Sequence, residues 1–71
     1  MIDSHEYFNE LEIPPALQTR IEELLRTAEA LLKEEIVDIF VEDNTAANNE
    51  RIYPSVFAFT ATYLVQCPTN N

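Results

Sequence analysis

The sequence predicts an α+β fold: a short N-terminal helix, a long amphipathic helix and an antiparallel β-hairpin, with the long helix packed on one face of the sheet. Three observations support this prediction. Apolar residues recur at helical spacing through residues 15–34, the run 56–65 is the most apolar and β-inclined stretch, and a second β-branched run covers residues 36–42. A chain of 71 residues has room for one small domain.

Residues 1–13 are predicted to form an N-terminal arm or a short helix. Tyr7, Phe8 and Leu11 would lie on one side of a two-turn helix. Because so short a helix is unstable in isolation, we expect these side chains to pack onto the rest of the protein. The Pro-Pro pair after this segment favours a new helix start, since proline is well tolerated in the first helical turn.

The long helix is predicted over residues 15–34. Glu22 with Arg26, and Glu29 with Lys33, form i, i+4 pairs that each contribute about 0.2–0.5 kcal/mol on an exposed face. The apolar positions follow the three- and four-residue spacing of one helix face. They are Leu17, Ile21, Leu24, Leu25, Ala28, Leu31 and Leu32.

Residues 36–42 are predicted as the first strand, and a helix that continues to Asp43 is the alternative. The helical spacing of apolar residues runs on through Phe40, and no glycine marks a helix end. The strand is favoured because the run is dense in β-branched residues. Glu34 and Glu35 would also bring negative charge to the C-terminal end of a longer helix, where the dipole disfavours it.

Residues 52–67 are predicted as the second strand, joined to the first by a loop over residues 43–50. Glycine is absent, so Asn48 or Asn49 is the candidate for a left-handed conformation in this loop. A loop that joins two β runs makes antiparallel pairing the simple outcome. Residues 68–71 are predicted to form a frayed tail.

The two faces of the second strand differ in side-chain size. Alternation places Phe57, Phe59 and Tyr63 on one face, which we expect to be the core face beneath the long helix. The opposite face carries smaller, partly polar side chains and is the predicted partner or dimer interface. Its residues are Val56, Ala58, Thr60, Thr62 and Leu64.

A flat, partly apolar face is of a kind that monomers usually cover. The N-terminal segment, through Tyr7, Phe8 and Leu11, is an alternative cover for the small-residue face, and both possibilities stay open. A two-stranded sheet also has two unpaired edges. Because so small a chain gains stability from a partner subunit, we predict a homodimer completed through the sheet.

The charge balance excludes several functions. Thirteen acidic and four basic residues give a net charge of −9, which argues against direct binding to nucleic acid or to an anionic membrane surface. The absence of glycine removes the glycine-dependent phosphate-binding loops. The longest apolar run, about ten residues, is far short of the roughly 20 that span a bilayer.

No stretch predicts catalysis. His5, the only histidine, has no evident nucleophile near it, and Cys67 has no cationic neighbour that would lower its pKa. The acidic residues lack the calcium-loop pattern. We therefore expect a protein without enzymatic activity, cofactor or metal. The lone cysteine and the lack of a secretory signal at the start predict a cytoplasmic location.

These features predict a small acidic protein–protein interaction module that self-associates through its sheet. The alternative is a regulatory inhibitor that mimics nucleic acid and binds the basic groove of a nucleic-acid-handling protein. A third possibility makes this chain one module of a larger assembly. The inhibitor would use an acidic patch, and its binding would weaken with salt, whereas an apolar sheet contact would hardly change. The patch comprises Glu34, Glu35, Asp38, Glu42 and Asp43, and the full negative array would add the N-terminal Asp3, Glu6, Glu10 and Glu12.

Overall fold

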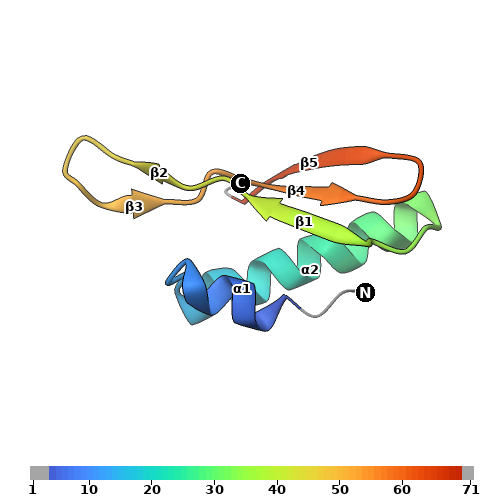
Figure 1. The fold of residues 1–71 in the computed structure, drawn as a ribbon, viewed down its shortest axis with the longest axis horizontal. Coiled ribbons are helices and arrows are strands. Elements are labelled where there is room, and N and C mark those ends of the chain that lie inside the picture. The colour runs from blue at the N-terminus through green and yellow to red at the C-terminus, as the bar shows by residue number, and fades with distance from the viewer. Residues whose placement is uncertain (1–3, 70–71) are drawn as a thin grey trace.

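The computed structural model describes residues 4–69 and combines helices with a small antiparallel sheet, so the α+β prediction is confirmed (Figure 1). Strands β1, β4 and β5 form a sheet in the order β1-β4-β5, and β2 pairs with β3 in a separate hairpin that projects from it. The helices are α1 (His5–Glu10) and α2 (Pro15–Leu32). The strands are β1 (Asp38–Val41), β2 (Asn44–Thr45), β3 (Arg51–Ile52), β4 (Ser55–Phe59) and β5 (Leu64–Pro68).

Helix α2 begins at Pro15 as predicted and ends two residues earlier than predicted, at Leu32. Lys33 adopts the left-handed conformation, with φ of 56°, and its N–H donates to the carbonyl of Glu29 at 2.8 Å. The Glu29 carboxylate then accepts the N–H of Ile36 at 2.9 Å. The helix therefore ends without glycine, and Glu29 helps to guide the chain into β1.

The strand prediction for residues 36–42 is confirmed by β1, so the longer helix to Asp43 is wrong. Strand β1 pairs antiparallel with β4, with Asp38 opposite Phe59 and Val41 opposite Val56. The density of Ile and Val in this run agrees with its place in the sheet.

The predicted strand 52–67 is wrong as a single element, because the chain reverses between β4 and β5. The Thr60 hydroxyl oxygen accepts the N–H groups of Thr62 at 3.2 Å and Tyr63 at 2.8 Å. The Thr60 N–H donates to the Tyr63 carbonyl at 2.9 Å. A threonine side chain thus organises the turn, a known role of Ser and Thr in glycine-free turns. The result is a third strand in the sheet.

The segments around the β2–β3 hairpin and the C-terminus are more ordered than predicted. Within the predicted loop 43–50, β2 forms and Asn49 is left-handed with φ of 67°, as expected for one of the two asparagines. Pro68 belongs to β5, and the buried Thr69 donates its N–H to the Pro54 carbonyl at 3.0 Å. The frayed-tail prediction is therefore wrong for residues 68 and 69, and residues 70–71 lie outside the described part of the chain.

The core lies between the helices and one face of the sheet. That face is the one carrying Val56 and Ala58, which are both fully buried, so the prediction that Phe57 and Phe59 form the core face is wrong. Small and β-branched side chains on this sheet face allow α2 to approach closely. The helix contributes the small side chain of Ala28 to the same core cluster. The core residues are Phe8, Ile13, Ile21, Leu25, Ala28, Ile36, Ile39, Val41, Tyr53, Val56 and Ala58.

Candidate functional site

The helices cover one face of the three-stranded sheet and leave its other face uncovered (Figure 1). Large apolar side chains remain exposed on this uncovered face. We call this surface, formed by Phe40, Phe57, Phe59 and Leu64, the outer face. Phe40 is 54% exposed and Leu64 is 62% exposed. The rings of Phe40 and Phe57 lie 6.1 Å apart between centroids. Exposed apolar surface of this kind makes the outer face a candidate interaction site.

The five residues predicted as an interface do not share a surface. Val56 and Ala58 are buried in the core, so the prediction is wrong for these two. Thr60 and Thr62 belong to the turn before β5. Leu64 lies on the outer face, because it is directly opposite Phe59 in the β4–β5 pair. After the turn, the even-numbered residues of β5 therefore share a face with the odd-numbered residues of β4. Of the two open possibilities, self-cover therefore holds for Val56 and Ala58, whereas Thr62 and Leu64 stay exposed.

The N-terminal segment contributes to that cover. Phe8 is fully buried in the core cluster, and Tyr7 and Leu11 pack against it. The expectation that α1 is held by its apolar residues is thus confirmed. The uncovered surface is the aromatic one, which sequence reasoning assigned to the core. Both faces of β4 are apolar, so the alternation of side chains cannot show which face is buried. The small side chain of Ala58, which lets a helix pack closely, was the feature of the sequence that indicated the core face.

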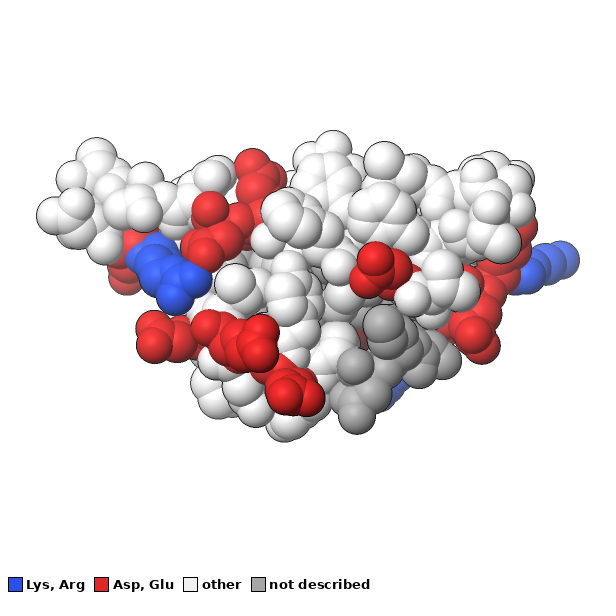
Figure 2. Space-filling model, in the orientation of Figure 1, with Lys and Arg blue, Asp and Glu red and all other residues white. Residues whose placement is uncertain are grey.

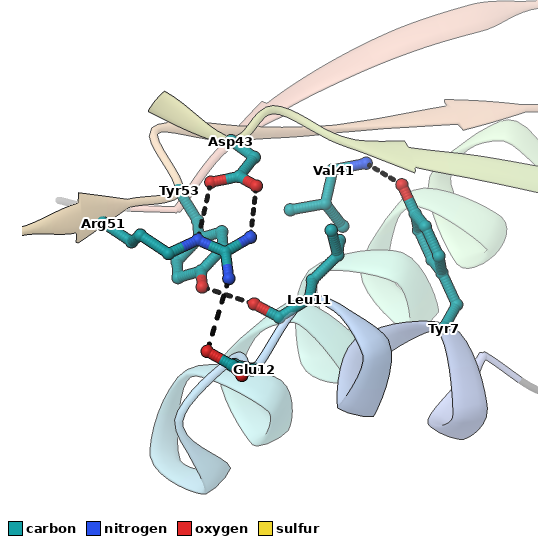
Figure 3. Close-up of polar contacts among 7 residues, drawn as sticks. All are labelled: Tyr7, Leu11, Glu12, Val41, Asp43, Arg51 and Tyr53. Atoms are coloured by element: carbon teal, nitrogen blue, oxygen red, sulfur yellow. Dashed lines mark hydrogen bonds and ion pairs between the residues drawn. The ribbon is translucent and has the colours of Figure 1, made fainter. Parts of the chain in front are cut away.

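The β1 edge of the sheet is blocked by groups of the chain itself. The N–H of Glu42 bonds to β4, so the alternation of an antiparallel pair directs the backbone groups of Ile39 and Val41 away from the sheet. The Ile39 N–H donates to the Asp38 carboxylate at 2.9 Å. The Val41 N–H donates to the Tyr7 hydroxyl at 3.1 Å (Figure 3). An edge with occupied donors is protected against pairing with another strand.

The β5 edge is open. Thr60 bonds to Tyr63, and Thr69 bonds to Pro54. Since residues of an antiparallel strand bond alternately to one neighbour and to the other side, Leu64 and Gln66 direct their N–H and C=O groups away from β4. Within residues 4–69, none of these outward groups has a hydrogen-bond partner. Proteins usually protect such an edge with charged residues. Here residues 54–71 carry no charged side chain at all.

A groove of about 200 Å³ lies between α2 and β5, on the helix side of the open edge. Leu31, at its border, is 78% exposed. Burial raises the pKa of the Cys67 thiol, which therefore stays protonated and apolar at neutral pH. No lining residue is charged. The lining residues are Leu24, Thr27, Ala28, Leu31, Leu32, Val65 and Cys67.

A wider, open hollow of about 490 Å³ lies near the base of the β2–β3 hairpin, beside Leu17, Arg51 and Tyr53. Its neighbourhood is organised by contacts within the chain (Figure 3). The Tyr53 hydroxyl donates to the Leu11 carbonyl at 2.6 Å, and the guanidinium of Arg51 lies 5.7 Å from the Tyr53 ring centroid. Arg51 and Tyr53 beside this hollow thus stabilise the fold through contacts within the chain.

The structure does not gather the predicted acidic patch into one array. Glu34 and Glu35 precede β1, Asp38 begins it, and Glu42 and Asp43 lie beyond its other end. In Figure 2 the carboxylates are distributed in separate groups, and the surface over β4 and β5 is largely white. The surface over β4 and β5 thus carries no charged side chain, whereas Asp38 lies opposite Phe59 on the neighbouring strand β1.

Several of these carboxylates have partners within the chain, as Asp38 does on β1. Asp43 forms an ion pair with Arg51, which also reaches Glu12 at 3.5 Å (Figure 3). The interaction with Asp43 raises the pKa of Arg51. Hydrogen bonding from Thr60, with a smaller contribution from Thr62, lowers the pKa of the Glu34 carboxyl. The ion pair of Asp43 with Arg51 therefore supports local structure beyond the C-terminal end of β1.

His5 is exposed on α1, and Cys67 is half-buried on β5. Within residues 4–69, no cluster of three or more His, Cys, Asp or Glu side chains is arranged to hold a metal ion. Neither helix in this part of the chain has the length and apolar character needed to cross a membrane. Comparisons with models of known protein families, with curated proteins and with solved structures found no match.

Proposed function

We propose that this protein is a small, non-enzymatic protein–protein interaction module that self-associates through its sheet. The observation that carries the proposal is the contrast between the two sheet edges. Tyr7 and Asp38 block the β1 edge, whereas the outward groups of Leu64 and Gln66 on β5 are unpaired. An unprotected edge is a template for pairing with another strand.

The distribution of charge supports a second copy of the chain as the partner. Two copies that each carry a net charge of −9 repel one another unless the contact lies on neutral surface. Residues 54–69 supply such surface along β4 and β5. Most soluble oligomers are closed, symmetric homodimers. An uncharged open edge on an acidic protein fits that arrangement.

The acidic-inhibitor alternative has less support. A nucleic-acid mimic requires a continuous array of carboxylates, whereas the five predicted residues are divided between the two ends of β1. Asp43 is paired with Arg51 and Glu34 interacts with Thr60. The ion pair with Arg51 offsets the charge of Asp43 that a basic partner would meet.

Light scattering behind a sizing column, at low and at high salt with reductant present, tests the proposal. We expect a mass of twice 8.2 kDa at both salt concentrations. Gln66→Pro should reduce the mass to that of one chain, because proline removes an outward N–H without removing a bond to β4. A wild-type mass of 8.2 kDa at both salt concentrations would contradict self-association.

Gln66→Thr is the matched control. It removes the same side chain, including its hydrogen bond to the Ser55 hydroxyl at 3.1 Å, but keeps the backbone N–H. We therefore expect this variant to remain dimeric. If the proline and threonine variants have the same mass, the outward N–H does not hold the two chains together.

A further inference from the structure

We infer that β5 pairs antiparallel with β5 of a second copy in one register, with Leu64 opposite Gln66 of the partner and Val65 on the two-fold axis. This inference rests on the proposed self-association and specifies its geometry. The pairing would join the two three-stranded sheets into one continuous sheet with the helices on one side.

The register follows from the positions of the outward groups. A hydrogen-bonded pair in an antiparallel ladder requires two residues whose N–H and C=O groups face each other. On β5 these are Leu64 and Gln66, since Val65 and Cys67 face β4. Placing Leu64 opposite Gln66 lets every outward N–H of these residues in both chains donate to a partner carbonyl. No outward group of Leu64 or Gln66 is then left unpaired.

Neighbouring registers satisfy fewer groups. Pairing Gln66 with Gln66 of the second copy places Leu64 opposite Pro68, which has no N–H, so the Leu64 carbonyl is left unpaired. Pairing Leu64 with Leu64 instead places Gln66 opposite Thr62, whose N–H already donates to the Thr60 hydroxyl. An unpaired polar group at a buried interface costs about 1–3 kcal/mol. The Leu64–Gln66 register avoids this cost.

The groove between α2 and β5 also supports pairing in this register. Val65 lines the groove between α2 and β5, together with Cys67 and the exposed Leu31. With Val65 on the two-fold axis, the Val65 side chains of the two copies meet on this side of the sheet. The groove is therefore continuous with the proposed interface, and the second copy covers apolar surface that the isolated chain leaves exposed.

The two edges also explain why the assembly stops at two copies. The three-stranded sheet of each chain offers one edge with unpaired outward N–H groups, on β5, and the antiparallel β5 contact uses this edge in both copies. The remaining edges are the two β1 strands, whose outward N–H groups are occupied by Asp38 and Tyr7. Such an isologous contact closes, whereas two open edges on each chain would produce a growing sheet.

Disulfide trapping tests the register. In a Cys67→Ser background, Val65→Cys places two thiols directly opposite each other at a non-hydrogen-bonded pair, within the Cβ separation that a disulfide requires. We expect mild oxidation to convert the chain to a covalent dimer. Gln66→Cys in the same background is the matched control, because the two Gln66 positions are diagonal, and it should crosslink roughly tenfold more slowly.

The outcomes separate the register from the proposed function. A dimeric mass with faster crosslinking at position 66 than at 65 would overturn the register and leave self-association standing. A monomeric mass for the unsubstituted chain, with no crosslinking at either position, would overturn both. Rapid crosslinking at position 65 alone supports the arrangement.

Amide hydrogen exchange provides a second measurement on the unsubstituted protein, where no substitution can disturb folding. The N–H groups of Leu64 and Gln66 should be protected, and their protection should increase with protein concentration. Exchange at the rate of unprotected amides at every concentration would contradict pairing through β5.

Discussion

Tyr53 connects parts of the chain that lie far apart in sequence. Its hydroxyl donates to the Leu11 carbonyl at 2.6 Å, which fixes the segment after α1 against the strands. Its own carbonyl accepts the hydroxyl of the buried Thr69. The ring lies under the Arg51 guanidinium (Figure 3). One buried side chain thus holds the α1–α2 connection near the point where the β2–β3 hairpin leaves the body.

We expect Tyr53→Phe to lower the free energy of unfolding by about 1–2 kcal/mol, because the Leu11 carbonyl loses its donor in a partly buried setting. Urea denaturation followed by circular dichroism measures this change. Tyr63→Phe is the control. Tyr63 is half exposed and its hydroxyl makes no hydrogen bond within residues 4–69, so its loss should change stability by less than about 0.5 kcal/mol. Equal effects would contradict the role of the Leu11 contact.

At the scale of elements, the end of α2 carries a conformational cost. The chain has no glycine, and Lys33 occupies the left-handed position at the helix end with φ of 56°. A residue with a Cβ is strained there, whereas glycine is the residue most often found at this position. The N–H of Lys33 still donates to Glu29, so the helix closes normally despite the strain.

Lys33→Gly should raise the free energy of unfolding by about 0.5–1 kcal/mol, because glycine relieves the left-handed strain. Ala30→Gly, on the exposed side of the same helix, is the matched control and should lower stability by about 1 kcal/mol. Thermal or urea denaturation reports both changes. A destabilisation by both variants would mean that the Lys33 side chain contributes more than its backbone strain costs.

The sequence predicts α2 and β1 well because their patterns are local. Helical spacing from Leu17 to Leu32 and the β-branched residues before Phe40 require no knowledge of the rest of the fold. The turn at Thr60 was missed because it lacks glycine and proline and depends on hydroxyl hydrogen bonds within an apolar, β-inclined run. The face of β4 was misassigned because both of its faces are apolar, so Ala58 and the phenylalanines each fit a core.

The candidate site was predicted less well than the fold, because it depends on long-range contacts. Blocking of the β1 edge requires Tyr7 to meet Val41, which is 34 positions away in the chain. The open edge exists only because the chain reverses at Thr60 and creates β5. Neither feature has a local sequence pattern. The residues of the outer face were visible in the sequence, but their exposure was not.

At the scale of the whole molecule, the open β5 edge lies in the part of the chain that carries no charged side chain. Acidic residues lie on both helices, at the start of β1 and beyond its end, whereas β4 and β5 carry no charged side chain. A net charge of −9 on each copy favours solubility and opposes unspecific association. The proposed association therefore falls along the uncharged β4 and β5, and within residues 4–69 the β5 edge is the edge of that sheet whose outward N–H groups have no partner.

This asymmetry predicts that opening the blocked edge allows assembly beyond two copies. The double substitution Tyr7→Phe with Asp38→Ala removes the acceptors of the Val41 and Ile39 N–H groups, so each chain would have two open edges. We expect a cost of about 1–3 kcal/mol in stability and a mass that grows with concentration beyond the dimer, measured by light scattering. Adding Gln66→Pro should stop this growth, because it closes the β5 edge. If the double variant stays at the dimer mass, the Tyr7 and Asp38 contacts do not limit assembly, and repulsion between the acidic chains alone is sufficient to do so.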